Sequence, residues 1–333
     1  MDALTHTLAS YALSRAASKA PSLRLTILYI AAGLAPDLDA LAKLAGVMPG
    51  LGYSRAVTHS LAGAGALAVL LALVFWRLEA RRSPGKMTFL RALGSSALAA
   101  GAHLLMDATT SRGVALLWPF RQTRTAGDLM LEIEPILLAA LLLGVLLPLL
   151  FRLISEEIGA KKSSSAGRGW ALFTLAAVAL YGGARFLLHT RAVTALEASS
   201  YHGRAALHAG AFPSSPWPMT WRGVVETEMT IEEVDVSLGA VEAVHPERAR
   251  THYKPESSPL LEAVRSTRTA QFYLKLARFP AASIEKTFQG YRADLREIGY
   301  STLRAREDVC VGTFQLNEQG KVLSEGLRWE RAK

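Results

Sequence analysis

The stretch His103-Leu-Leu-Met-Asp107-Ala-Thr-Thr-Ser-Arg-Gly113 closes an apolar segment that covers residues 92–106. On a helix, residues four apart lie on one face, so the His103 imidazole and the Asp107 carboxylate can bind one metal ion. The apolar segment can lie in a membrane or in a buried helix bundle, where ionisable side chains cost free energy and usually have a partner or a function. The alternative is a hydrogen bond between these two side chains that ties a helix end to a loop.

The composition favours a membrane protein. Half of the 333 residues are apolar, and the mean hydropathy of +0.22 is high for a soluble protein. The single cysteine, Cys310, excludes an internal disulfide and a cysteine-based zinc site. The net charge of +9 fits basic residues that flank membrane helices better than it fits nucleic-acid binding. Asp2 and His6 interrupt the N-terminal segment, so we expect no cleavable signal peptide.

Four segments are apolar enough and long enough to span a bilayer, which takes about 20 residues. They cover 61–76, 90–106, 136–154 and 170–188. Basic residues crowd the loops 77–91 and 152–168, so the positive-inside rule predicts that both loops are cytoplasmic. His59, His103 and Asp107 would then face outward, together with everything after residue 190.

The N-terminal region is predicted to form helices that do not span. Residues 1–20 have the pattern of an amphipathic helix, and residues 23–35 are apolar but too short to cross a bilayer. The second segment runs into Pro36-Asp37-Leu38-Asp39, so we interpret it as a half-buried or re-entrant helix that ends at an acidic turn. If it were a true span, Asp2 and His6 would lie on the opposite face from Asp39 and could not join a common site.

Beyond about residue 200 the sequence changes to short β-rich runs. The predicted fold is an α-helical polytopic membrane domain over 1–190, a Pro-rich linker over 191–218 and a small soluble β-rich α+β domain outside the membrane over 219–333. Strands are predicted at 223–231, 234–241, 271–278 and 309–316, and short helices at 260–269 and 283–288.

Eight polar residues border apolar segments in the first third of the chain: Asp2, His6, Asp37, Asp39, Arg55, His59, His103 and Asp107. Histidine and aspartate without cysteine form a nitrogen and oxygen ligand set that suits zinc first, and manganese or iron next. Such a site can activate water and bind a phosphoryl oxygen. Three separated segments each deliver His or Asp to one membrane face, which favours a metal site over coincidence.

Each of these residues also has a structural alternative. Asp2 can favour the positive N-terminus of the first helix, and Asp37 and Asp39 can cap a helix or form a turn. His59 can begin an interfacial helix, and Arg55 can extend to lipid headgroups. Two further carboxylates just before the third span either complete a metal site or cap that helix: Glu132 and Glu134.

Four motifs resemble those of the YdjM-like family, whose members are described as membrane-bound metal-dependent hydrolases. They are Met1-Asp2-x-x-Thr5-His6, Pro36-Asp37-x-Asp39, Arg55-x-x-Thr58-His59-Ser60 and His103-x-x-x-Asp107-x-x-Thr110-x-x-Gly113. The segment from Trp221 to Thr227 resembles the start of the extracytoplasmic tail of YfhP-type bacterial proteins. The motifs cover the first 115 residues, and the remainder matches loosely. The resemblance implies a multi-pass protein of the bacterial cytoplasmic (inner) membrane.

The YdjM-like family is distantly similar to the zinc-dependent phospholipase C and P1-nuclease group, which are all-helical enzymes with clustered zinc ions. The resemblance implies that His103 and Asp107 are central ligands, and that His59 and either Asp37 or Asp39 complete one ion.

The resemblance also implies a second ion, which His6 helps to hold and which Asp107 bridges. A metal-activated water would attack a phosphodiester, and Arg55 would steady the phosphate. Asp39 and Arg55 are therefore the predicted catalytic residues.

The leading hypothesis is a membrane-embedded metal-dependent hydrolase that acts at the outer face on a phosphodiester or phospholipid-like substrate. Its expected partner is membrane lipid rather than nucleic acid. The main alternative is a non-catalytic membrane protein with a structural His/Asp metal or hydrogen-bond site and a partner-binding C-terminal domain. A transporter is less favoured because the ionisable residues lie at helix ends rather than at mid-membrane.

Overall fold

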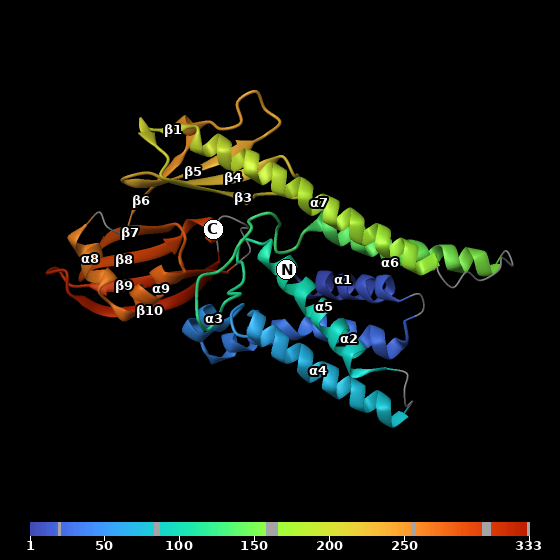
Figure 1. Cartoon of the computed structure of the whole chain (residues 1–333). Helices are drawn as coiled ribbons and strands as arrows, with labels where there is room; N and C mark the ends of the chain where they lie inside the picture. Colours follow the sequence, from blue (N-terminus) through green and yellow to red (C-terminus); the bar gives the residue numbers. More distant parts are fainter. Residues whose placement is uncertain (19–20, 83–86, 158–165, 255–257, 302–307, 332–333) are drawn as a thin grey trace. The chain divides into compact units, whose positions relative to one another are not determined.

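The computed structural model describes residues 1–333 except 19–20, 83–86, 158–165, 255–257, 302–307 and 332–333 (Figure 1). Parts of both basic loops used above for orientation therefore lie outside the described residues. The chain forms two compact units. The first holds Met1–Leu44 and Tyr53–Ala184, and the second holds Ala45–Gly52 and Arg185–Lys333.

The first unit is entirely helical in its long elements. These are α1 (Ala3–Ala17), α2 (Leu23–Leu34), the 3₁₀ helix η1 (Ala35–Ala45), α4 (Leu61–Arg82), α5 (Phe89–Ala108), α6 (Pro135–Glu157) and α7 (Ala166–Glu197), of which α7 continues into the second unit. All four predicted spans are present as long helices. The prediction of a helical membrane region is confirmed.

A fifth helix is also long enough to cross a membrane. Among the described residues, the candidate spans by length and composition are Leu23–Ala42, Leu61–Arg81, Phe89–Ala108, Pro135–Ile154 and Gly167–Glu197. The prediction that 23–35 is too short was wrong in its length, because η1 continues α2 without a break past Pro36. Pro36 stands at the change from α-helix to 3₁₀ helix, where it is the second residue of η1 and its missing N–H is tolerated. The predicted acidic turn, Pro36 to Asp39, is therefore part of the helix η1.

Helices α1 and α2 form an antiparallel hairpin that packs on α5, and α4 packs on both α5 and α2 (Figure 1). The buried core between them joins Leu25, Leu28 and Ala32 of α2 to Ala92 and Ala99 of α5. Small side chains let the helix backbones approach closely, as is common for helices in membranes. The hairpin brings the start of α1 and the end of α2 to the same end of the unit.

The second unit is built on an eight-stranded antiparallel sheet with strand order β10-β9-β8-β7-β6-β5-β4-β3. The strands are β3 (His208–Pro213), β4 (Thr220–Glu226), β5 (Thr230–Ser237), β6 (Arg250–Tyr253), β7 (Pro280–Thr287), β8 (Gly290–Glu297), β9 (Asp308–Leu316) and β10 (Val322–Arg331). A small hairpin, β1 (Ser200–Tyr201) and β2 (Arg204–Ala205), precedes them.

The sheet curls into a half-barrel. Phe279 stands just before β7, yet its ring stacks on His208 of β3 at 5.3 Å between centroids and meets Phe212 edge-on at 6.0 Å. Three strands separate β7 from β3 in the sheet order, so only strong curvature can bring these rings together. The prediction of a β-rich C-terminal domain is confirmed.

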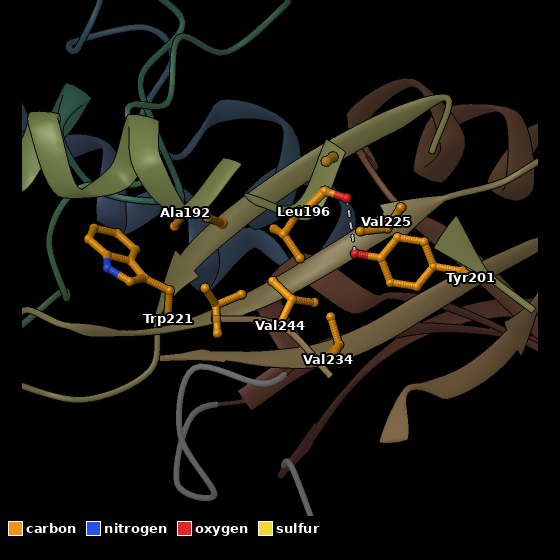
Figure 2. Close-up of a cluster of buried hydrophobic side chains, with 10 residues drawn as sticks. Ala192, Leu196, Tyr201, Trp221, Val225, Val234 and Val244 are labelled. Carbon is orange, nitrogen blue, oxygen red and sulfur yellow. Dashed lines mark hydrogen bonds between the residues drawn. The ribbon is translucent and has the colours of Figure 1, made fainter. Parts of the chain in front are cut away.

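Helices cover the other face of the sheet. The end of α7 packs Ala192 and Leu196 against Trp221, Val225 and Val234 (Figure 2). In the same cluster the Tyr201 hydroxyl of β1 donates to the Leu196 carbonyl at 3.1 Å, which ties the β1–β2 hairpin to the end of α7. At the other end of the sheet, α8 (Pro259–Arg265) and α9 (Arg268–Leu276) cover β8 and β9.

Two local predictions in this unit were wrong. Residues 271–278, predicted as a strand, lie mostly in α9, which Thr267 caps by accepting from the Ala270 N–H at 3.3 Å. Residues 283–288, predicted as a helix, belong mostly to β7, which turns into β8 at Gly290 with φ +134°. The predicted linker, 191–218, holds the end of α7 and strands β1 to β3.

Candidate metal centre

Four segments of the helical unit meet at one end of the α1–α2 hairpin. The first turns of α1 carry His6, η1 carries Asp37 and Asp39, the turn before α4 carries His59, and the last turns of α5 carry His103 and Asp107. The Asp2 side chain caps α1 by accepting from the Thr5 N–H at 3.0 Å, so its role is the structural one. The cap in turn fixes where His6 lies on α1.

Four of these residues form a group whose ligand atoms all lie within 4.8 Å of one another: Asp37, His59, His103 and Asp107. His59 Nε2 lies 3.1 Å from Asp107 Oδ2, and His103 Nε2 lies 3.1 Å from His59 Nε2. Asp37 Oδ1 is 3.7 Å from His103 Nε2 and 3.8 Å from His59 Nε2. Two nitrogens and two oxygens are a common ligand set for tetrahedral zinc.

The hydrogen bonds on the far side of each imidazole favour a cation in this group. His103 Nδ1 lies 2.6 Å from the Gly33 carbonyl oxygen, which only accepts, so Nδ1 carries the proton. His59 Nδ1 lies 2.8 Å from Asp39 Oδ2, which is likewise an acceptor. If both rings are neutral, their two Nε2 lone pairs face each other, and a metal ion between them satisfies both. The donor set therefore fits a divalent metal.

Gly33 serves the site through its backbone. A Cβ atom at this position would stand 1.9 Å from Ser10 Oγ on the neighbouring helix α1. The absence of a side chain lets α1 and α2 approach, while the Gly33 carbonyl orients His103. No sequence motif indicated this role, because the contact joins residues 70 positions apart.

Asp39 lies on the outer nitrogen of His59 rather than in the group of four. It is buried, and besides His59 it accepts from the Ala56 N–H at 3.3 Å. A carboxylate in this position orients a ligating imidazole and increases its basicity. The structure thus separates Asp37 from Asp39: the first lies among the candidate ligands, and the second lies behind one of them.

His6 joins the site from α1. Its Nε2 lies 3.1 Å from Asp107 Oδ1, and its ring stacks on His103 with 3.7 Å between centroids. Its Nδ1 is buried and has no hydrogen-bond partner in the part of the chain that the structure describes. The expectation that a spanning α2 would separate His6 from Asp39 was wrong, because α1 runs antiparallel to α2 and returns His6 to the same end.

Asp107 is the centre of the arrangement. Its Oδ1 is shared by His6 and the Met1 amine, and its Oδ2 by His59 and by Arg55, whose Nε lies 3.4 Å away. The carboxylate is fully buried. A carboxylate with partners on both oxygens has the geometry to bridge two cations.

Arg55 is buried beside the group rather than extended toward lipid headgroups. Its Nη2 lies 2.8 Å from Glu132 Oε2, and its Nη1 donates to Thr110 Oγ1 at 3.0 Å. Burial opposes the charge on Arg55, but Glu132 and Asp107 outweigh it and raise the pKa of Arg55. The backbone at Arg55 has φ +56°, a left-handed conformation that turns the chain toward His59.

Neither glutamate near the third span lies in the group of four. Glu132 is the partner of Arg55, and although burial opposes its charge, Arg55 and the N-terminal amine lower the pKa of Glu132. Glu134 accepts from the Leu131 N–H at 3.2 Å and from the Tyr181 hydroxyl at 3.0 Å, so it ties the loop before α6 to α7. The pairing of Glu132 with Arg55 had no sequence signal.

The comparisons with known proteins agree with the motifs. No curated protein and no solved structure matches the chain. The family described as "YdjM inner membrane protein" matches residues 1–192, which is more than half of the chain and includes every residue of the site described above. The protein therefore belongs to the YdjM inner membrane protein family.

Proposed function

We propose that this inner membrane protein is a metal-dependent hydrolase that cleaves a phosphodiester or phospholipid-like substrate with an activated water. One observation carries the proposal: the Nε2 atoms of His59 and His103 face each other at 3.1 Å while Asp37 and Asp107 point at the same space. Zinc is the metal that this ligand set fits best, with manganese and iron next. A bound zinc ion supplies Lewis acidity and lowers the pKa of a coordinated water.

The side chains around the ligands have distinct proposed roles. Asp39 holds His59 in the tautomer that presents Nε2 to the ion. Asp39 is also the carboxylate nearest to His59, so the two side chains can share a proton. Arg55 places a buried positive charge beside Asp107, where it can pair with a phosphate oxygen. His6 and Asp107 together are the proposed ligands of a second ion.

The proposed site faces away from the cytoplasm, and so does the β-rich unit. This orientation rests on the basic residues of loops 77–91 and 152–168. A reporter fused after Lys333 should therefore be active outside the cytoplasm. Reporter activity in the cytoplasm would reverse the orientation.

A second function is supported by the cations that already surround Asp107. The Met1 amine, Arg55 and a protonated His59 would balance its charge without a metal, which would make the cluster a structural hydrogen-bond knot. Burial opposes the charge on His59, but its hydrogen bonds to Asp107 and Asp39 outweigh it and raise the pKa of His59. In this case the protein is not an enzyme, and the β-rich unit binds a partner.

Elemental analysis of the purified full-length protein separates the two functions. The hydrolase proposal predicts at least one tightly bound zinc, manganese or iron per chain, which His103→Ala removes. His252→Ala is the matched control, since His252 pairs with Glu233 in the β-rich unit at 3.3 Å, and it should keep the metal. Metal-free wild-type protein with unchanged stability in His103→Ala would sink the hydrolase proposal. Bound metal without turnover of bis(4-nitrophenyl) phosphate or of phospholipid would favour the structural site.

A further inference from the structure

The helix η1 carries the site on its inner side and leucines on its outer side. In a 3₁₀ helix, residues three apart are eclipsed, so Leu38, Leu41 and Leu44 follow one another along a single face. These leucines are 54%, 61% and 86% exposed, whereas Asp39 of the same helix is buried. We call Leu38, Leu41 and Leu44 the leucine face. One short helix therefore presents apolar side chains outward and carboxylates inward.

The metal-site group opens beside this face. The side chains of His59, His103 and Asp107 are 0–1% exposed, but that of Asp37 is 35% exposed. Of the four side chains in the group, that of Asp37 is therefore the most accessible from outside. Asp37 is the direct neighbour of Leu38, so the open side of the group borders the leucine face.

A second exposed apolar segment is fixed to the site from the α5–α6 loop. Leu117 is 50% exposed and Phe120 is 90% exposed. The loop is held in place by two backbone hydrogen bonds, from the Ala115 N–H to the Arg55 carbonyl and from the Leu61 N–H to the Leu116 carbonyl, each 3.0 Å long. The loop is thus bonded to Arg55, which we propose to bind the phosphate, and to Leu61 at the start of a candidate span.

The leucine face is continuous with a surface that suits a bilayer. The candidate span Leu23–Ala42 contains Leu38 and Leu41, so the face begins inside the apolar length of that helix and ends just beyond it. Apolar side chains at this height lie at the boundary between acyl chains and headgroups. A water-soluble substrate gains nothing from such a border, but an amphiphile gains burial for its chains.

Resting on the hydrolase function proposed above, we propose that the leucine face lies in the bilayer interface and that the substrate is a membrane lipid with a phosphodiester headgroup. Its acyl chains lie along Leu38, Leu41 and Leu44, and its headgroup reaches inward past Asp37 to the ligands. The substrate thus enters sideways from the membrane.

The first test compares lipid and soluble substrates in full-length protein reconstituted in vesicles of phosphatidylethanolamine and phosphatidylglycerol. The triple variant Leu38→Gln/Leu41→Gln/Leu44→Gln should lose about tenfold or more of lipid headgroup release, because three apolar contacts with the acyl chains are lost. Its turnover of bis(4-nitrophenyl) phosphate should stay within about twofold of wild type, because that ester does not use the face. The matched control is Leu23→Gln/Leu90→Gln, which alters leucines of 75% and 76% exposure at the opposite ends of α2 and α5.

The second test does not depend on activity. A nitroxide spin label is attached to the cysteine of Leu41→Cys, with the buried native Cys310 left in place. Its EPR relaxation rate should be increased by oxygen dissolved in the lipid and not by a water-soluble nickel complex. A strong increase of the relaxation rate by the nickel complex would overturn the proposal that the leucine face contacts the membrane. Wild-type protein that cleaves the soluble ester but no lipid would overturn the substrate assignment and leave the hydrolase function standing. If neither compound is cleaved, the proposed function fails, and the nitroxide alone decides whether the leucine face contacts lipid.

Discussion

The helical unit and the β-rich unit bury charged groups in different ways. In the β-rich unit, Glu297 accepts from the backbone N–H groups of Phe279 and Gly299 at 3.0 Å, and Glu232 accepts from the Thr230 and Thr251 hydroxyls at 2.7 and 2.8 Å. Each carboxylate has its own neutral donors. Such full satisfaction by local donors is what a buried polar group in a stable fold requires.

In the helical unit, one carboxylate is shared by many groups. Asp107 is approached by two imidazoles, a guanidinium and the N-terminal amine from sequence positions as far as 106 residues away. Meanwhile the Nε2 atoms of His59 and His103 face each other at 3.1 Å, and carboxylate oxygens of Asp37 and Asp107 lie beside them. The comparison teaches that burial of a carboxylate is not in itself a sign of function. Convergence of several ligand atoms on one space is the sign.

The largest effect on the contrast between the two units is expected from a substitution at Asp107. Asp107→Asn removes the charge that all its partners share, so metal affinity should fall at least about 100-fold, beyond what loss of an orienting partner costs. Chelator competition on the purified protein measures this affinity. Glu297→Gln, a like change of a buried carboxylate in the other unit, should leave the affinity unchanged. Full metal content in Asp107→Asn would mean that the centre of the site lies elsewhere.

Asp39→Asn sharpens the distinction between a ligand and the residue behind it. Because Asp39 contacts only the outer nitrogen of His59 in the candidate site, its loss should weaken metal binding by about 10- to 100-fold. The same chelator competition applies, with Asp37→Asn measured alongside. If Asp39→Asn abolished binding as fully as Asp107→Asn does, Asp39 would itself be a ligand.

Glu297→Gln should affect stability and not the site. The amide presents one acceptor oxygen where the carboxylate presents two to the N–H groups of Arg278, Phe279 and Gly299, so the free energy of unfolding should fall by roughly 1–3 kcal/mol. Thermal denaturation of the full-length protein, with metal content checked in parallel, measures both. A variant as stable as wild type would show that these hydrogen bonds are not needed.

The smallest expected effect concerns the pH dependence of stability at Cys310, because this thiol does not change its charge at neutral pH. Burial raises the pKa of the Cys310 thiol to about 12. The folded state thus favours the neutral thiol: its contribution to stability is complete below the pKa of about 8.5 in the unfolded chain and is lost as the pH rises toward 12. Melting curves from pH 7 to 10 should fall more steeply at the alkaline end for wild type than for Cys310→Ala. Identical slopes would contradict the shift.

The sequence predicted the long elements well, because hydropathy and charge alone identify segments such as Leu61–Arg82 and Pro135–Glu157. The prediction failed where the composition of a segment suggests a different secondary structure from the one that the segment adopts. The run that begins at Pro36 has the composition of a turn, yet it forms the 3₁₀ helix η1, whose two carboxylates contact His59 and His103 of the site. The segments 271–278 and 283–288 were exchanged between helix and strand, because short alternating runs fit both periods and only tertiary packing decides between them.

The site was predictable as a set of residues and not as an arrangement. The motifs indicated His6, His59, His103 and Asp107, since their spacing and their positions at helix ends are visible in one dimension. The division of labour between Asp37 and Asp39 was not visible, because it depends on which nitrogen of His59 each one faces. The pairing of Arg55 with a glutamate 77 positions away was hidden for the same reason.

Gly33 gives this arrangement an unusual genetic consequence. It contributes no side chain, yet its carbonyl fixes the proton of His103, and its bare Cα leaves room for Ser10 of helix α1, which also carries His6. Even the smallest replacement, alanine, would push the two helices apart and displace two histidines at once. In a saturation scan, position 33 should therefore be as intolerant as the metal ligands themselves, although no ligand atom belongs to it.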